Sequence, residues 1–323
     1  MNRSINWRGA RRAARLLLIV GVAVPLVACD TSALLQVDEP SFATPSTLNN
    51  LKGLPTLYAG AIGDFQVGMS GVGLADAYLS NVSLFSDELK SSDTFTTRNA
   101  TDYRESFPVA QGNTSDVAYN QLQYARRSAA EIADVVAELV GKADARYATL
   151  KALEGFTIIG LGEAFCGAVP LGTAKQGAPG ELGVPLTTQE LFNEAIKRFD
   201  EALANNASLN QAKVGKGRAL LNNGQYAAAA AAVAGVPTTF VYFIEHSSNA
   251  GREYNPIFTL QDNRRYTMSD VEGINGLNYV TANDPRTPWN MHPQIGFDNT
   301  TPVVRTGRYR DSYPGRWART RYL

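Results

Sequence analysis

The sequence predicts a mainly α protein in which consecutive helices pair and are followed by an irregular, loop-rich portion. Two observations lead to this expectation. Between Leu122 and Ala234, apolar residues recur at helical spacing in segments separated by turns. Beyond Val236, the pattern changes to short extended runs between Asn-, Gly- and Pro-rich turns. With 323 residues, 44% of them hydrophobic, the chain can bury a substantial core as one large domain or two modest ones.

Charge is distributed unevenly along the chain, although the formal net charge is zero. Residues 1–28 contain five arginines and no acid, and residues 302–323 contain six arginines and one acid, Asp311. Residues 29–301 therefore carry 19 basic and 29 acidic groups. Such an acidic body repels phosphate backbones, so we expect no nucleic-acid partner. With only two cysteines and two histidines, we expect no metal site and no cofactor.

Residues 1–28 have the pattern of a secretory signal peptide. A basic segment precedes an apolar run over residues 16–28, which spans about 20 Å as a helix and is too short to cross a bilayer core of roughly 30 Å. The run Leu-Val-Ala-Cys that ends at Cys29 resembles a bacterial lipobox, so Cys29 is the expected site of lipidation and membrane anchoring. An ordinary secretory signal with a chance cysteine is the alternative. After the signal peptide, residues 29–45 are expected to form a polar linker.

The stretch that begins near Ser46 predicts an amphipathic helix of about five turns. Its apolar positions are Leu51, Leu54, Tyr58, Ala61, Ile62 and Phe65. From Gly71 to Asn113 the helical spacing is lost and small polar residues dominate. A loop of this length is usually functional or disordered, so this segment is a candidate ligand-binding loop.

Two long helices are predicted next. The first has one continuous apolar stripe and ends at Gly141: Leu122, Ala125, Ala129, Ile132, Val136 and Leu139. The second, from Ala145 to Phe165, has apolar residues around most of its circumference, so we expect it to be the more buried of the two. Cys166 follows it and has apolar neighbours, which favours a buried thiol over a nucleophile. Residues 167–185 are rich in Gly and Pro and predict a long loop.

Three further helices complete the helical part. A capping box formed by Thr187 and Glu190 opens the first of them. The next two, over residues 211–221 and 225–234, are joined by a tight turn, and the second consists mainly of alanines that we expect to pack closely against another backbone. This helix, turn and Ala-rich helix resembles a tetratricopeptide repeat, and the earlier pairs have similar proportions. We therefore expect residues 46–237 to form a tetratricopeptide-like helical domain.

Residues 238–301 predict the start of a loop-rich binding portion, either an irregular subdomain or binding loops mounted on the helical layer. Ten aromatic residues lie between positions 240 and 309: Phe240, Tyr242, Phe243, Tyr254, Phe258, Tyr266, Tyr279, Trp289, Phe297 and Tyr309. Residues 302–323 are Arg-rich and lack apolar periodicity, so a composition boundary is expected near Pro302.

The order of these features resembles the SusD/RagB family over most of residues 20–300. The runs that support the resemblance, beside the lipobox and the early Tyr58-Ala59-Gly60, are Tyr124–Arg127, Ala212–Leu221 with Asn223–Gln225 after it, Val236–Pro237, Ser269–Gly273 and Asp284–Arg286. The resemblance implies an outer-membrane lipoprotein without catalytic activity. It also implies that the protein binds a glycan or another nutrient over a TonB-dependent transporter, using a variable loop-rich portion carried by a tetratricopeptide-like helical layer.

The chain departs from that family in its final segment. Family members continue with further helices after the aromatic segment, whereas this sequence stops at Leu323 after an Arg-rich stretch. Our hypothesis is that the chain is a truncated or frameshifted product and that its last twenty or so residues, within 302–323, are not native to the family.

Ligand binding is expected at four residues: Asp87, Arg98, Tyr103 and Trp289. Capture of a sugar needs an apolar plane to stack on the ring and planar polar groups to bond its hydroxyls, and these residues offer both types. The alternative is that the aromatic side chains only attach their loops to the core.

No pattern in the sequence indicates an enzyme. Asp87 and Glu88 are adjacent, which points their carboxylates apart in an extended loop, and His246 and His292 lie in no recognisable catalytic motif. The predicted function is nutrient capture at the outer membrane. The alternative is a tetratricopeptide-like lipoprotein scaffold that binds a protein partner in the cell envelope, and the aromatic segment favours capture.

Overall fold

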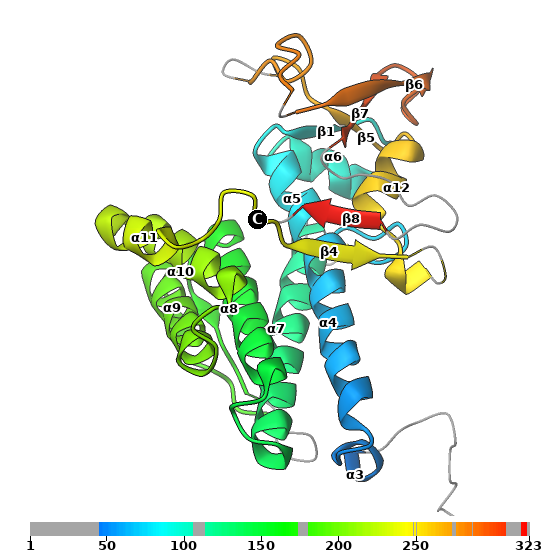
Figure 1. The fold of residues 1–323 in the computed structure, drawn as a ribbon. Helices are drawn as coiled ribbons and strands as arrows, with labels where there is room; N and C mark the ends of the chain where they lie inside the picture. Colours follow the sequence, from blue (N-terminus) through cyan, green and yellow to red (C-terminus); the bar gives the residue numbers. More distant parts are fainter. Residues whose placement is uncertain are drawn as a thin grey trace, which may run out of the picture. The chain divides into compact units, whose positions relative to one another are not determined.

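The computed structural model describes residues 45–105, 114–173, 180–247, 249, 251–272, 276–285, 287–307 and 318–321. Residues 1–44 lie outside this part, so the signal peptide, lipidation at Cys29 and nearly all of the polar linker stay predictions. The described part is mainly α, as predicted (Figure 1). Within it, no helix has both the length and the apolar character needed to cross a membrane.

The first predicted helix is interrupted. Its residues form two helices, α3 (Pro45–Leu48) and α4 (Leu54–Ser70). Between them, the side-chain oxygen of Asn50 accepts hydrogen bonds of 3.0 Å from the backbone N–H groups of Lys52 and Gly53, which turns the chain. Leu51 lies in this turn and is 64% exposed, so it is not part of the apolar face, whereas Leu54 is buried.

The stretch expected to be a loop contains three short elements, so that prediction is wrong for much of its length. They are α5 (Tyr78–Phe85), β1 (Leu89–Ser91) and α6 (Thr96–Asp102). Tyr78, Leu84 and Leu89 anchor α5 and β1 in the core. Elements of eight, three and seven residues are too short to display a clear apolar period.

Two long helices follow, and both were predicted: α7 (Thr114–Leu139) and α8 (Ala145–Ala164). The side chain of Asp144 caps α8 by accepting a 3.0 Å bond from the N–H of Arg146. Helix α8 is buried around most of its circumference because it contacts α7 on one side and α9 on another (Figure 1). The main hydrophobic core therefore surrounds α8, and a smaller cluster joins it to α4 and α7.

The helical part ends with α9 (Thr188–Asn205), α10 (Asn210–Asn222) and α11 (Tyr226–Val233). The predicted capping box is confirmed: Glu190 donates its N–H to Thr187 Oγ1 at 3.3 Å, and its carboxylate accepts the N–H of Thr187 at 2.8 Å. Ala229 is the buried residue of α11, and most of the other alanines are exposed. Helix α11 packs against α10, and a Cβ atom built at Gly217 of α10 would lie 3.4 Å from the carbonyl oxygen of Ala229. The expected close approach to another backbone is therefore found on this side of α11.

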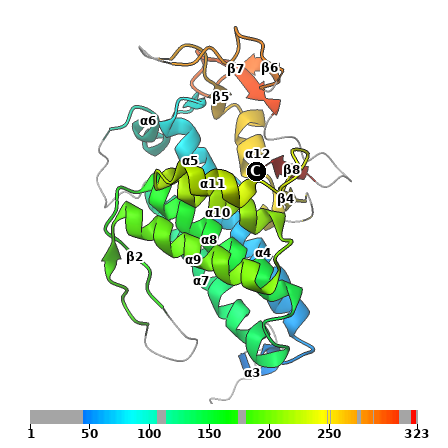
Figure 2. The ribbon, with the colours of Figure 1, turned by 60° about the vertical axis from the view of Figure 1, so that its left-hand side comes forward.

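The Gly- and Pro-rich segment after α8 is partly an antiparallel hairpin. Its strands are β2 (Val169–Pro170) and β3 (Pro185–Leu186), and Thr173 pairs with Glu181 between them. Figure 2 shows β2 at the left of the helical layer, and Gln123 Nε2 of α7 donates to the carbonyl oxygen of Pro170 at 2.9 Å. Cys166 precedes the hairpin and is exposed, so the prediction of a buried thiol is wrong.

The rest of the chain forms short elements: β4 (Phe243–His246), η2 (Gly251–Glu253), α12 (Pro256–Asp262), β5 (Tyr266–Met268), β6 (Trp289–Ile295), β7 (Pro302–Thr306) and β8 (Ala318–Arg321). The antiparallel pairs are β1 with β5, β4 with β8 and β6 with β7. Leu89 stands opposite Met268, so two segments that lie far apart in the sequence pair with each other.

The predicted boundary at Pro302 coincides with the first residue of the strand β7. Val303 and Val304 of β7 are buried. The N–H of Val304 donates to Thr267 Oγ1 at 2.8 Å, and the N–H of Thr306 donates to the side chain of Gln261 at 2.8 Å. Residues 302–306 are therefore integrated into the fold, and the composition change does not mark its edge.

Candidate functional site

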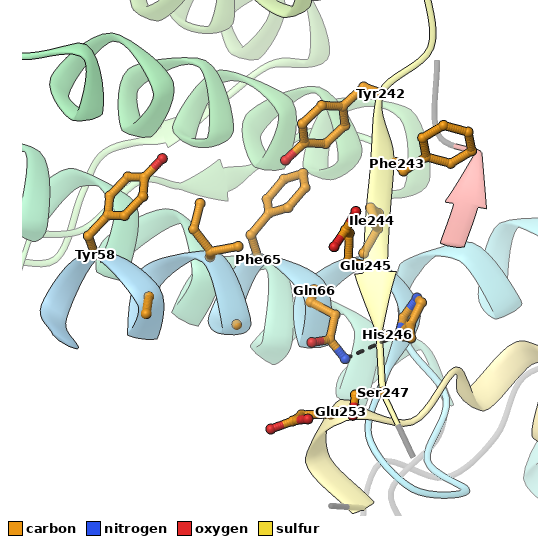
Figure 3. Close-up of a pocket in the computed structure, with 13 residues that line it drawn as sticks. Tyr58, Phe65, Gln66, Tyr242, Phe243, Ile244, Glu245, His246, Ser247 and Glu253 are labelled. Carbon is orange, nitrogen blue, oxygen red and sulfur yellow. Dashed lines mark hydrogen bonds between the residues drawn. The ribbon is translucent and has the colours of Figure 1, made fainter. Parts of the chain in front are cut away.

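A pocket of about 610 Å³ lies between α4 and β4 (Figure 3). This volume is within the roughly 300–1,000 Å³ that is usual for small-molecule sites. The lining residues of α4 are Tyr58, Ala59, Ile62, Gly63, Phe65 and Gln66. The lining residues of β4 and its neighbours are Tyr242, Phe243, Ile244, Glu245, His246, Ser247 and Glu253.

The two secondary structures explain how these side chains converge. Residues 58, 62 and 65 recur at helical spacing, so they share the face of α4 that points to β4. Side chains of the strand alternate, with Ile244 and His246 buried and Glu245 exposed. In Figure 3, the ring of Tyr242 lies on the α4 side of the strand, near Phe65.

His246 gives the pocket a polar but uncharged wall. Its Nδ1 lies 3.2 Å from Gln66 Nε2 and 3.0 Å from the carbonyl oxygen of Tyr254. Burial lowers the pKa of His246 to about 4, so the ring is neutral at pH 7. Gln66 Nε2 also donates to the carbonyl oxygen of Arg252 at 3.1 Å, so this amide connects α4 with β4 and η2.

Carboxylates dominate the charged groups of the lining. Glu245 and Glu253 both line the pocket. At one side, the guanidinium of Arg252 forms an ion pair with Asp64. Carboxylate oxygens accept hydrogen bonds from hydroxyl groups, and ring faces accept the C–H groups of a sugar, so the lining can hold a hydroxyl-rich ring.

The described residues contain no group of three or more His, Cys, Asp or Glu side chains arranged to hold a metal ion. The α4–β4 pocket therefore presents aromatic faces and carboxylates without a metal centre in the part of the chain that is described.

Arg98, a predicted ligand-binding residue, lies in the interior instead. It is 7% exposed, and its guanidinium forms ion pairs of 2.9 Å with Asp76 and 2.6 Å with Asp93. Its Nη2 donates to the carbonyl oxygen of Leu74 at 2.7 Å. The sequence placed it in a loop, but α6 carries it inward. The geometry assigns Arg98 a structural role.

Asp87 and Tyr103 lie at neighbouring ends of α5 and α6. Asp87 forms a 2.6 Å ion pair with Arg104, whose Nη2 also donates to the carbonyl oxygen of Phe85 at 2.8 Å. Tyr103 is 63% exposed. The structure brings these two predicted residues to one surface, but neither lines the α4–β4 pocket.

Trp289, the fourth predicted residue, begins β6 opposite Thr306. Its side chain is partly buried, and its Nε1 is buried with no hydrogen-bond acceptor among the described residues. It also lies outside the α4–β4 lining, so the four predicted residues do not form one site.

No protein-family model matches the chain, and no curated protein is significantly similar to it. The functional assignment therefore depends on the pocket and on the order of motifs along the chain.

Sequence reasoning missed the pocket because its two sides are far apart in the chain. Tyr58 was assigned to the apolar stripe of the first helix, and Tyr242 was one of ten aromatics in the irregular segment. The sequence showed that each of these positions has an aromatic residue in a predicted helix or extended run. Nothing local indicates that residues separated by more than 180 positions face one another.

Proposed function

We propose that the protein is a lipid-anchored outer-membrane protein of the SusD/RagB type, which binds a glycan or another nutrient and delivers it to a TonB-dependent transporter. The observation that carries the proposal is the combination of aromatic rings and carboxylates around the α4–β4 pocket (Figure 3). The lipobox ending at Cys29 and the order of motifs support the anchoring and the family assignment.

Recognition in this pocket uses two kinds of contact. The rings of Tyr58 and Tyr242 offer faces for the C–H side of a sugar, and Glu245 and Glu253 accept hydrogen bonds from its hydroxyls. The neutral ring of His246 adds a polar wall without charge. The proposal assigns binding, and no chemical step, to these residues.

The helical part serves as the platform for this pocket. Helices α7 to α11 each contact the next one in the chain, and α4 packs on α7. This succession supports a tetratricopeptide-like arrangement, in which neighbouring pairs build one continuous core and loops on one side bind a ligand.

Affinity gel electrophoresis of the full chain against a panel of neutral polysaccharides tests the proposal. We expect retardation by at least one glycan, and we expect Tyr242→Ala and Glu245→Gln each to weaken binding at least about tenfold. Tyr226→Ala is the matched control because Tyr226 is 70% exposed on α11 and does not line the pocket. Equal retardation of all variants would exclude the pocket as the glycan site.

Anchoring is tested separately. Cys29→Ser should move the protein from the membrane fraction to the soluble fraction, because the serine hydroxyl does not replace the thioether that carries the lipid. Mass spectrometry of the wild-type protein should find an acylated N-terminal cysteine after cleavage. An unmodified cysteine in a cytosolic fraction would contradict the localisation.

One observation favours the alternative, a scaffold that binds a protein partner. Helix α11 exposes an apolar surface of alanine side chains, together with Leu221 at 53% and Tyr226 at 70% exposure. Photo-crosslinking from position 228 in the cell envelope distinguishes the two functions. A crosslink to an envelope-assembly protein, with no co-purifying TonB-dependent transporter, would support the scaffold.

A further inference from the structure

A second pocket of about 400 Å³ lies between α7 and the β2–β3 hairpin. It shares no lining residue with the α4–β4 pocket. Six lining residues matter for its chemistry: Tyr119, Tyr124, Arg126, Arg127, Gly172 and Glu181.

Arg126 is a buried cation with only neutral hydrogen-bond partners. It is 7% exposed. Its Nε donates to Gln123 Oε1 at 3.0 Å, and its Nη2 donates to the carbonyl oxygen of Gly172 at 2.6 Å. Among the described residues it forms no ion pair, and its Nη1 donates to no acceptor. One edge of the guanidinium is thus available to a further acceptor in the pocket that it lines.

Glu154 does not form an ion pair with Arg126 among the described contacts. Glu154 is the carboxylate that interacts with Arg126 at longer range, and its two oxygens are bonded to Arg198 Nε at 2.9 Å and Lys151 Nζ at 3.0 Å. Burial lowers the pKa of Arg126, which reflects the cost of keeping its charge away from water. A guanidinium forms charge-assisted hydrogen bonds with a carboxylate, and these are stronger than its bonds to neutral acceptors.

The walls of the pocket provide ring faces. Tyr119 is held in place by an edge-to-face contact with Phe165, with ring centroids 5.2 Å apart. Tyr124 is 50% exposed, and the guanidinium of Arg127 lies 5.5 Å from the centre of its ring. Arg127 is a second cation of the lining, and its Nε lies 3.6 Å from Glu131. Among the lining residues, Glu181 supplies a carboxylate that opposes anion binding.

We propose that this pocket binds a small ring-bearing organic acid, with its carboxylate on the guanidinium of Arg126 and its ring against Tyr119 and Tyr124. The planar guanidinium fork matches a planar carboxylate, and the two tyrosines contact a ring that an inorganic anion lacks. The site goes beyond the proposed glycan pocket and does not depend on it.

Isothermal titration calorimetry of the full chain at low ionic strength tests this assignment. The probes are glucuronate and benzoate, with glucose and inorganic phosphate as comparisons. We expect saturable binding of at least one acid and binding of glucose and phosphate that is at least about tenfold weaker. Arg126→Gln should weaken acid binding at least about tenfold, because it removes the buried charge.

Further variants separate the site from general effects. Glu181→Gln should strengthen acid binding by about two- to fivefold because it removes a like charge, and Tyr124→Ala should weaken it. Lys197→Gln on α9 and Tyr242→Ala in the α4–β4 pocket are controls that should leave acid binding unchanged. The Tyr242 control also separates this test from the test of glycan binding.

Four results would overturn the proposal: neither acid binds, glucose binds as well as glucuronate, phosphate binds as tightly as the acids, or folded Arg126→Gln binds the acids as the wild type does. Circular dichroism establishes whether that variant folds. If Arg126→Gln does not fold, the test uses the acid affinities of Tyr124→Ala and Glu181→Gln. Unchanged acid affinity in both of these variants would equally overturn the assignment.

Discussion

Arg98 and Asp93 form a 2.6 Å ion pair in which the carboxylate side chain has no solvent exposure. Asp93 also accepts a 2.6 Å contact from Arg265, and Asp76 pairs with Arg98 at 2.9 Å and accepts the hydroxyl hydrogen of Tyr266. These contacts join α6 and the segments beside it to β5. Because these charged groups are buried, removing one of them would leave its partners as unpaired buried charges.

Replacing Arg98 with methionine should lower the free energy of unfolding by about 3–5 kcal/mol, because two buried carboxylates lose a partner. Urea denaturation followed by circular dichroism measures the change. Arg104→Met is the matched control: its ion pair with Asp87 is partly exposed, so we expect a loss of about 0–1 kcal/mol. Similar losses in the two variants would contradict the structural role of Arg98.

A methyl group at Gly215 of α10 should also destabilise the fold. A Cβ atom there would lie 2.3 Å from the ring of Phe199 and 2.8 Å from that of Phe156. These two rings pack edge to face, so neither can move without disturbing the core. Gly215→Ala should lower the free energy of unfolding by about 1–3 kcal/mol.

Gly60→Ala on α4 provides the comparison. Among the described residues, no neighbouring atom lies within 4 Å of a Cβ built at this position, so the substitution should stabilise the helix by about 0.5–1 kcal/mol. Thermal unfolding of both variants measures the contrast. The packing argument would be wrong if Gly215→Ala matched or exceeded the stability of Gly60→Ala.

His246 should make the protein less stable in mild acid. Its pKa is lowered to about 4 by burial, from an unfolded value near 6.5, so between these values the unfolded state binds more protons than the folded state. The stability from this group is fully present above about pH 6.5 and is lost as the pH falls toward 4, by about 3 kcal/mol.

Denaturation curves at pH 7 and pH 4.5 test this dependence. His246→Gln should show a smaller difference between the two pH values, whatever its absolute stability. His292→Gln removes the other histidine, on β6, and should keep the wild-type difference. An unchanged difference in His246→Gln would show that other groups cause the acid sensitivity.

Asp102 should make the protein less stable as the pH rises, which is the opposite of the effect of His246. Desolvation raises its pKa to about 7, and its Oδ1 is buried without a partner among the described residues. Its folded state binds the proton more tightly, so its stability contribution is present below about pH 4 and is lost as the pH rises through 7. Asp102→Asn should therefore raise the free energy of unfolding at pH 8 by about 1–3 kcal/mol. A gain at pH 4 as large as that at pH 8 would contradict this cause.

The long helices could be predicted because their patterns are local. Helix α7 repeats its apolar stripe over many turns, and the capping box at Thr187 requires only residues close in the sequence. Helix α5 could not be predicted in this way. It is two turns long, and contacts across the chain hold it, such as the 2.5 Å bond from the Tyr78 hydroxyl to Glu163.

The candidate site was also hard to predict, because its residues are brought together by contacts between distant parts of the chain. Asp87, Arg98 and Tyr103 were chosen as polar or aromatic residues of a supposed loop. The guanidinium of Arg98 instead lies 5.5 Å from the ring centre of Tyr266 in β5, which is far along the chain. The pocket walls at Tyr58 and Tyr242 likewise meet only in the folded protein. Residue type identified suitable chemistry, whereas tertiary contacts determine which side chains face a cavity.

The pairing of β1 with β5 has a consequence for the order of folding. Residues 89–91 can pair only after residues 266–268, which lie far along the chain, have come close to them. Each of the helices α7 to α11, in contrast, packs against the helix next to it in the sequence. Local contacts form quickly and closure of a long loop costs additional entropy, so the central helices should assemble in an early kinetic phase. The pairing of β1 with β5, whose Tyr266 contacts Arg98, should then form in a later, slower phase.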